Sequence, residues 1–263
     1  WHDWAYGGAG TDRTPYGVPE NLKKDILTFA YNDLDSLRKV FKEHPGEIAC
    51  VIMWPTETTE AWPAEGFLQG VKDIAHENGA LLVYDEIRTG FRFALGGAQE
   101  YFGVVPDLTA VSKAIANGYP LAAVVGRKDI MSAAEKTRLS ATFIVNAFPM
   151  YAALATIAEL REKNGVAHLW EMGQRLLDGL QGVMDEAGVG VEMMGPASIP
   201  YMRFTEPDND KRQELMNAFY AGVAGRGVIL HPKHCWFLSL AHTREDIDRT
   251  IEVCRDSMKA AKA

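Results

Sequence analysis

The sequence has few of the features that would assign it to several common classes of protein. Its three cysteines form no CxxC pair and are odd in number. We therefore expect neither a disulfide framework nor a cysteine-based zinc site, and we expect a reducing cytoplasmic location. No apolar run approaches the roughly 20 residues of a membrane-spanning helix. The net charge of −8 and the pI near 5.4 argue against nucleic acid and anionic membranes as partners, because both favour excess Lys and Arg.

Motifs for other chemistries are also missing. Gly96 and Gly97 open neither a GxGxxG pattern nor a P-loop, and no GxSxG nucleophile elbow is present, so a dinucleotide-binding motif and a hydrolase triad have no support. His231, His234 and His242 are spaced too loosely for a helical metal motif. The chain opens at Trp1 without Met or a signal peptide, and we expect it to be a piece of something longer.

The first part of the chain alternates helical and strand patterns. Punctuation by Gly and Pro predicts irregular structure over residues 1–32. Apolar spacing of three and four residues predicts two helices, over 33–44 with Asp33 or Asp35 as cap and over 67–78 with Gly79 after its end. Short apolar runs predict strands over 48–53, 80–84, 106–111 and 121–125. This alternation predicts an α/β fold with a mostly parallel central sheet.

The pattern changes after about residue 145. Helices are expected over 149–163, 166–187, 210–226 and 243–259, and short strands over 189–194, 199–204, 228–230 and 236–240. Thr243 and Asp246 resemble a capping box at the start of the last helix. We therefore expect residues 1–160 to belong to a larger domain and residues 161–263 to form a smaller α+β domain.

Two side chains at the ends of predicted strands are candidates for chemistry. Asp85 follows five residues without a polar side chain, and a carboxylate there can pair with a cation such as a protonated ring nitrogen. Lys113 follows the next strand, where partial desolvation would make its amine a nucleophile. The structural alternatives remain open: Asp85 or Glu86 can cap a turn and pair with Arg88 or Arg92, and Lys113 can be a solvated cap.

Together, three stretches resemble the class III, or ω-type, aminotransferases of fold-type I, in particular the glutamate-1-semialdehyde aminomutase-like branch. They are Leu81–Arg92, Pro106–Leu108 and Ser112–Pro120, which includes a tight turn at 118–120. The resemblance continues through Gly227–Pro232 and Ala241–Asp248. It implies a pyridoxal-phosphate-dependent transferase with a large cofactor-binding domain and a small C-terminal domain.

The resemblance also implies a role for each matching residue. Asp85 would pair with the pyridinium nitrogen of pyridoxal phosphate, and Ile87 would pack against the ring. Arg88 would lie near the cofactor's phenolic oxygen. Lys113 would form the Schiff base and then move the proton at the substrate Cα. Thr142 would reach the cofactor phosphate of a neighbouring subunit, so the resemblance implies a homodimer with shared active sites.

The sequence departs from the family's pattern at several points. Trp54 stands where the family usually has Glu before Pro55, and Glu57 or Glu60 is a possible substitute. Arg88 stands where relatives often carry Gln or Met, and residues 144–147 replace a Gly-rich segment. The family also has roughly 130–160 further residues upstream, including part of the cofactor's cradle.

The function implied by the resemblance is transfer of an amino group from a small amine or amino acid to a carbonyl acceptor. Other reactions on the same scaffold remain open, namely those of an aminomutase, an epimerase or a decarboxylase. A non-catalytic subunit or fragment is an alternative from a different class, because the upstream segment is missing.

Overall fold

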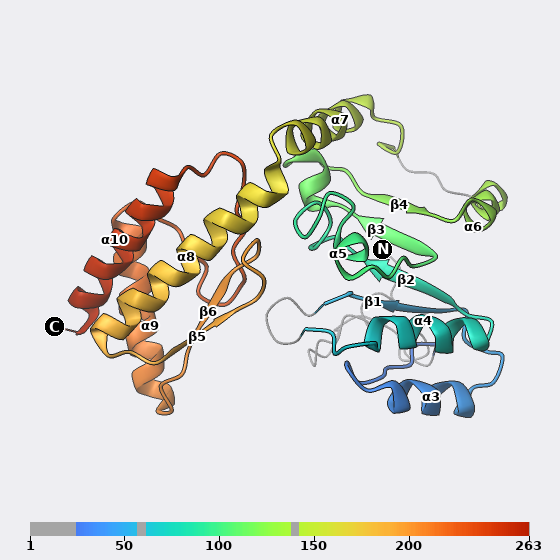
Figure 1. The fold of residues 1–263 in the computed structure, drawn as a ribbon, viewed down its shortest axis with the longest axis horizontal. Coiled ribbons are helices and arrows are strands. Elements are labelled where there is room, and N and C mark those ends of the chain that lie inside the picture. The colour runs from blue at the N-terminus through green and yellow to red at the C-terminus, as the bar shows by residue number, and fades with distance from the viewer. Residues whose placement is uncertain (1–24, 57–61, 138–141, 263) are drawn as a thin grey trace. The chain divides into compact units, whose positions relative to one another are not determined.

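The computed structural model describes residues 25–56, 62–137 and 142–262 (Figure 1). The chain divides into two compact units, the first made of Trp1–Met53 and Pro63–Val83 and the second of Trp54–Trp62 and Tyr84–Ala263. Most of the stretch predicted to be irregular, 1–32, lies outside the described residues. Its described part, 25–32, contains neither helix nor strand.

The first unit contains the two helices predicted before and after the first strand. Helix α3 (Leu34–Glu43) starts at Asp33, whose carboxylate accepts from the backbone N–H groups of Asp35 and Ser36, which settles the choice of cap. Helix α4 (Phe67–Glu77) ends at Asn78, followed by a left-handed Gly79 as predicted. The helices pack closely at Gly70, where an added Cβ would lie 2.5 Å from Leu34 Cδ1.

Four strands form one mixed, mostly parallel sheet in the spatial order β1-β2-β3-β4. They are β1 (Cys50–Met53), β2 (Leu81–Asp85), β3 (Leu108–Val111) and β4 (Ala123–Gly126). Strand β4 runs antiparallel to β3, with Leu108 opposite Gly126 and Val111 opposite Ala123. The α/β class and all four strands are therefore confirmed, although most are shorter than predicted.

Several short elements of the second unit had no clear signal in the sequence. They are α5 (Ala98–Phe102), the 3-10 helix η1 (Lys113–Ala116), α6 (Lys128–Met131) and the 3-10 helix η2 (Ser132–Lys136). Such one-turn elements are too short to show a period of 3.6 residues, so periodicity alone does not reveal them.

The last part of the chain is dominated by long helices. The elements are α7 (Ala147–Glu162), α8 (Gly165–Ala187), β5 (Val191–Met194), β6 (Tyr201–Phe204), α9 (Asn209–Gly225) and α10 (Arg244–Lys262). Strands β5 and β6 pair antiparallel, and α10 packs against α8 and α9. Within the described ranges, no helix combines the length and the apolar character needed to cross a bilayer.

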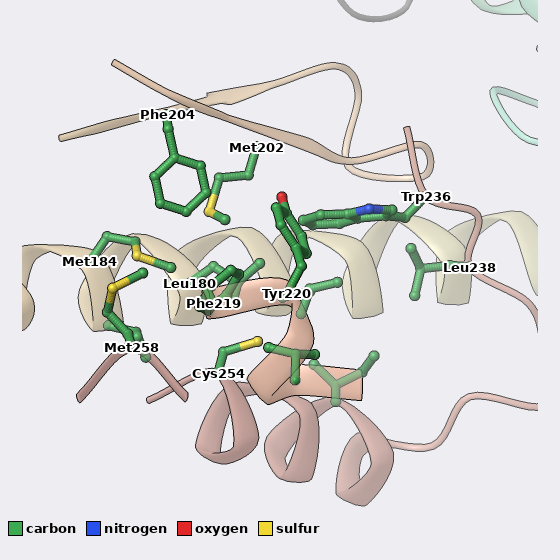
Figure 2. Packing of buried hydrophobic residues seen from close by; sticks show 14 of the residues in the cluster. Leu180, Met184, Met202, Phe204, Phe219, Tyr220, Trp236, Leu238, Cys254 and Met258 are labelled. Atoms are coloured by element: carbon green, nitrogen blue, oxygen red, sulfur yellow. The ribbon is translucent and has the colours of Figure 1, made fainter. Parts of the chain in front are cut away.

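Helices α8, α9 and α10 and the β5-β6 pair enclose one apolar core (Figure 2). Fully buried side chains come from three helices and a strand, for example Leu180, Met202, Phe219 and Met258. Burial raises the pKa of the Cys254 thiol to about 12, so this cysteine serves as a packing residue rather than as a nucleophile.

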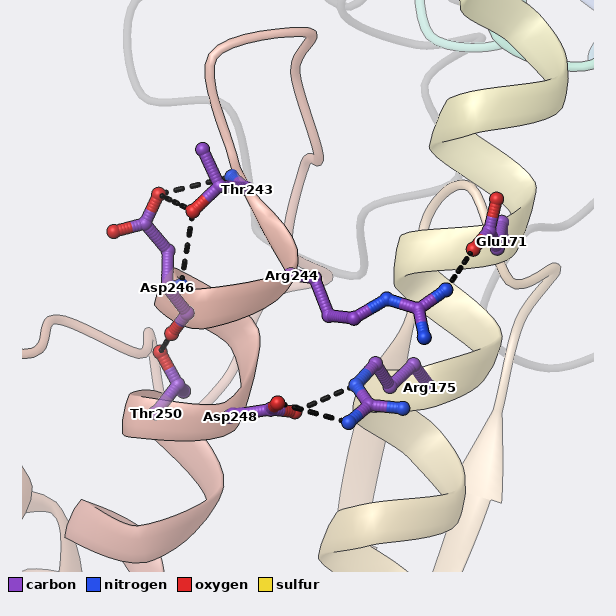
Figure 3. Close-up of polar contacts among 7 residues, drawn as sticks. All are labelled: Glu171, Arg175, Thr243, Arg244, Asp246, Asp248 and Thr250. Atoms are coloured by element: carbon purple, nitrogen blue, oxygen red, sulfur yellow. Dashed lines mark hydrogen bonds and ion pairs between the residues drawn. The ribbon is translucent and has the colours of Figure 1, made fainter.

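Polar contacts at the surface fix the start of α10 and its position against α8 (Figure 3). Asp246 accepts from the backbone N–H of Thr243, and Thr243 Oγ1 accepts in return from the backbone N–H of Asp246. The predicted capping box is thus confirmed with Asp in place of Glu. Arg175 on α8 donates to both carboxylate oxygens of Asp248, at 2.5 and 2.8 Å.

Two predicted strands are absent from the structure. Residues 228–230 and 236–240 form no strand. Trp236 and Leu238 are nevertheless buried with a half-exposed Phe237 between them, so the chain has the alternation of a strand without its ladder. Alternation reports burial on one face, whereas a strand also requires a neighbouring backbone with free donors and acceptors.

Candidate active site

Asp85 ends β2, and its carboxylate is held by two hydrogen bonds. The backbone N–H of Ile87 donates to Oδ1 at 2.9 Å, and the indole Nε1–H of Trp54 donates to Oδ2 at 3.2 Å. Neither donor is an arginine. An ionised carboxylate has about four acceptor positions, so the oriented Asp85 retains capacity for a further donor.

Trp54 also contacts Arg88, a second candidate residue. The guanidinium carbon of Arg88 lies 5.7 Å from the centroid of the Trp54 ring, a cation–π distance. Trp54 is 40% exposed. The two glutamates considered as substitutes, Glu57 and Glu60, lie outside the described residues. The indole at position 54 supplies a neutral donor to Asp85.

Glu86, next to Asp85, has a structural role. Its carboxylate is 1% exposed and accepts from the backbone N–H groups of Ala98 and Gln99 at the start of α5, and from Thr89 Oγ1 at 2.9 Å. Gly97 is required beside it, because an added Cβ would lie 2.3 Å from Glu86 Oε2. The capping alternative considered for this pair of carboxylates thus holds for Glu86, which anchors the turn that follows β2.

Lys113 begins the 3-10 helix η1 directly after β3, in a left-handed backbone conformation with φ of 47°. For a non-glycine residue this conformation costs of order 1–3 kcal/mol, and such strain is concentrated at functional sites. The preceding Ser112 donates its hydroxyl to the carbonyl of Leu121 at 2.7 Å. The backbone N–H of Tyr119 donates to the Ala116 carbonyl, so the predicted tight turn closes behind the lysine.

The ends of β2 and β3 are neighbours in the sheet. The backbone N–H of Glu86 donates to the carbonyl of Ala110 at 2.9 Å. The side chain of Lys113 reaches solvent, yet its partial burial lowers the pKa of its ammonium, and the nearby positive charge of Arg88 lowers it further, against the opposing effect of Asp85. The Asp85 carboxylate and the Lys113 amine therefore share one electrostatic environment.

Of the remaining predicted site residues, Ile87 and Arg88 follow Asp85 in the same turn, whereas Thr142 lies before α7. Ile87 and Arg88 are half-buried in the turn after β2. Thr142 lies in an exposed turn before α7, and none of its described contacts links it to Asp85 or Lys113. No cluster of three potential metal ligands occurs in the described ranges.

The sequence had indicated Arg92 only as a possible partner of a carboxylate. The structure buries it to 9% exposure. Its Nη1 donates to the carbonyl of Arg88 at 2.6 Å, and its guanidinium carbon lies 4.4 Å from the centroid of the Phe237 ring. Burial lowers the pKa of Arg92 to about 10, partly opposed by Cys235, so the side chain remains charged at neutral pH.

Aromatic contacts hold this turn against helix α8. The indole N–H of Trp170 donates to the Phe93 carbonyl at 3.2 Å, and its ring stacks on Tyr101 with an interplanar angle of 9°.

A separate pocket of about 650 Å³ opens beside residues 227–238. Its lining includes His231, His234 and Phe237.

Comparison with known proteins gives one consistent result. The profile of the family described as aminotransferase class-III matches residues 9–256. A 3-aminobutyryl-CoA aminotransferase from Cloacimonas acidaminovorans is 35% identical over all of this chain, and a glutamate-1-semialdehyde 2,1-aminomutase from Desulforamulus reducens is 36% identical over 98% of it. The chain spans 63% of the length of each of these relatives.

Solved structures agree with these relatives. The pyridoxal-phosphate internal aldimine form of the FumI protein from Sphingopyxis sp. MTA144 superposes with a TM-score of 0.90 and 31% identity, over 99% of this chain and 62% of that one. An omega-transaminase from Sphaerobacter thermophilus gives a TM-score of 0.86 at 25% identity, over 100% of this chain and 66% of that one. The fold is that of the pyridoxal-phosphate transaminases, and this chain belongs to the class III aminotransferase family.

Proposed function

We propose that the protein containing this chain is a pyridoxal-phosphate-dependent aminotransferase, which moves an amino group from a small amine or amino acid to a carbonyl acceptor. The observation that carries the proposal is the pair of adjacent strand ends, where an oriented carboxylate at Asp85 faces the same environment as a partly desolvated amine at Lys113. Membership of the class III family supports it.

The donor set at this site fits the cofactor. Pyridoxal phosphate, when bound, supplies an aldehyde carbon for an amine and a cationic ring that accepts electrons from the substrate Cα. Asp85 would bind the protonated ring nitrogen with its remaining acceptor capacity. Ile87, two residues further along the chain, would pack against the ring face, and Arg88 would contact the phenolic oxygen.

Lys113 would hold the cofactor through Nζ and, when released, move the proton at the substrate Cα. A lysine must lose its proton to act as a nucleophile or a base. Burial and the charge of Arg88 lower the Lys113 pKa, which raises the fraction of neutral amine at a given pH. The left-handed backbone of Lys113 holds this amine at the end of β3.

The assembly and the organisation of the chain are part of the same proposal. Thr142 would bind the cofactor phosphate of a second copy, which gives a homodimer with shared sites; its exposure before α7 supports such a contact. A small domain from about residue 161 is supported by the apolar core, whose buried members lie between Leu169 and Met258. The three cysteines, all free, support a cytoplasmic location.

Borohydride reduction of the full polypeptide with its cofactor, followed by peptide mapping, tests the assignment of Lys113. We expect the pyridoxyl group on Lys113 and on no other lysine. Lys113→Ala should lose both the label and transaminase activity, whereas Lys128→Ala, an exposed lysine on α6, should keep both. A label elsewhere, or activity retained in Lys113→Ala, would refute the proposal. A protein that takes up no cofactor would favour a non-catalytic subunit.

An aminomutase is the second candidate, because relatives with that name cover 93–98% of this chain. Both reactions use the same residues, and the sequence does not separate them. Product analysis with an amino donor and an oxo acid does so. Consumption of the oxo acid supports amino transfer, whereas an isomerised product with no oxo acid consumed supports the mutase. Racemisation or CO₂ release would indicate an epimerase or a decarboxylase.

A further inference from the structure

A pocket of about 650 Å³ lies between the segment 227–238 and the first turns of α10. All of its lining belongs to the second unit, and neither Asp85 nor Lys113 is part of it. Pockets that receive small molecules have volumes of about 300–1,000 Å³. The pocket is therefore a candidate binding site separate from the lysine that we assign to the reaction.

One wall of the pocket is apolar and firmly held. It includes Trp236, Leu238 and Ile247, which are 8%, 7% and 3% exposed and belong to the apolar core (Figure 2). The backbone N–H of Trp236 donates to the Pro200 carbonyl at 2.8 Å, and its indole N–H donates to the His231 carbonyl at 2.9 Å. Such a wall is a preformed surface for the apolar body of a ligand.

Two histidines of the lining have a ring N–H donor available for a ligand. His231 Nδ1 accepts from the backbone N–H of Lys233, and His242 Nδ1 accepts from that of Ser239, both at 3.1 Å. A ring nitrogen that accepts carries no proton, so the proton of each neutral ring lies on Nε2. Neither Nε2 has a hydrogen-bond partner among the described residues.

Arg249 adds a positive charge to these two donors. It is exposed and lines the pocket, and within the described ranges it forms no hydrogen bond or ion pair. Arg244 on the same helix, in contrast, pairs with Glu171 at 2.7 Å. The carboxylate of the lining, Asp246, is occupied by the helix cap, because the N–H and the hydroxyl of Thr243 both donate to its Oδ2 at 2.9 Å (Figure 3). Two neutral donors and one unpaired positive charge suit a group with a single negative charge.

We propose that this pocket binds a small carboxylic acid with an apolar body, an alkyl or aryl carboxylate, at a site separate from Lys113. The apolar body covers Trp236 and Leu238, and the carboxylate accepts from the N–H groups of His231, His242 and Arg249. A phosphate dianion fits less well, because one arginine leaves its second charge unpaired beside Asp246. The neutral amide of the same acid lacks the charge and one of the two acceptor oxygens.

The test compares 3-phenylpropanoate with 3-phenylpropanamide as ligands of the full polypeptide carrying its cofactor. Binding is measured by titration calorimetry, and the site is located from the histidine-ring NMR signals. One charge-assisted contact in an open pocket predicts that the acid binds about 10-fold more tightly than the amide. Arg249→Gln should weaken the acid by this factor and leave the amide unchanged. The matched control is Arg38→Gln, an exposed arginine paired with Asp35 on α3, which should bind both ligands as the wild type does.

The ring signals of His231 and His242 should shift when the acid is added, whereas that of His44, at the end of α3, should stay in place. Three results would overturn the proposal. They are a wild-type protein that binds the acid no more tightly than the amide, equal acid binding by Arg249→Gln and Arg38→Gln, and acid binding that leaves the signals of His231 and His242 unmoved. The proposed reaction is judged separately by the borohydride label on Lys113, so either proposal can fail while the other holds.

Discussion

Removal of the indole N–H of Trp54 tests how Asp85 is held. Trp54→Phe keeps an aromatic ring beside Arg88 but removes the donor to Asp85 Oδ2. Asp85 then retains the Ile87 backbone N–H as its described donor. We expect a carboxylate that is less well oriented toward the cofactor nitrogen, and therefore weaker binding of pyridoxal phosphate.

The size of the effect follows from the geometry of the bond. A hydrogen bond to a charged group contributes about 1.5–3 kcal/mol when well formed. The Trp54 bond is long at 3.2 Å and its side chain is 40% exposed, so solvent screening reduces the contribution to about 1 kcal/mol. That free energy corresponds to an increase of about fivefold in the dissociation constant of the cofactor.

The assay is a titration of the cofactor-free protein with pyridoxal phosphate, followed by the visible absorbance of the lysine-linked cofactor. Trp62→Phe is the matched control, because Trp62 is 42% exposed and packs against Phe93 without donating to Asp85. We expect binding by the control to equal that of the wild type. Equal or tighter binding by Trp54→Phe would refute a positioning role for the indole.

Three further predictions concern the supporting structure. Gly97→Ala should lower the free energy of unfolding, measured by denaturation, by about 2–4 kcal/mol, because the added Cβ would lie 2.3 Å from Glu86 Oε2. Gly103→Ala is the control: Gly103 also has a left-handed φ but open space around it, and this variant should lose about 1 kcal/mol. Arg88→Gln should raise the pKa of Lys113, so the pH midpoint for acylation of Lys113 in the cofactor-free protein should move upward; an unchanged midpoint would contradict the charge argument. The hydrogen bonds from Thr243 lower the pKa of Asp246 below its ordinary value of 3.8, so the Asp246 carboxylate should stabilise the fold above pH 3.8 and lose this effect at lower pH. Thermal melts of wild type and Asp246→Asn across this pH range measure the effect. A difference between the two proteins that is equal at all pH values would contradict this.

Features determined by neighbouring residues were predicted correctly from the sequence. The start of α3, for which Asp33 was one of two candidate caps, the glycine after α4 and the capping box of Thr243 and Asp246 each depend on residues within four positions of each other. Such motifs satisfy helix-terminal N–H and C=O groups whatever the rest of the fold does. The same locality explains why the alternation at 236–240 misled us, because a strand also needs a distant partner.

Features of the candidate site that the sequence did not reveal depend on long-range contacts. The bond from Trp54 to Asp85 spans 31 positions, and the contact of Arg92 with Phe237 spans many more. At position 54 the resemblance indicated a missing carboxylate, but not that the replacement would donate to the carboxylate that remains. The backbone strain at Lys113 likewise depends on how β3 meets η1, which residue types alone do not specify.

The adjacent carboxylates Asp85 and Glu86 show how one strand end separates two roles. Successive side chains of a strand point to opposite faces of the sheet, so chemically similar neighbours meet different surroundings. Glu86 points to the buried side, where Thr89 and the first N–H groups of α5 satisfy it. Asp85 accepts two hydrogen bonds and keeps acceptor capacity for a further donor. Glu86 thereby fixes the turn that carries Ile87 and Arg88, so Glu86→Gln should weaken binding of pyridoxal phosphate in the same titration, although its own side chain is buried away from solvent.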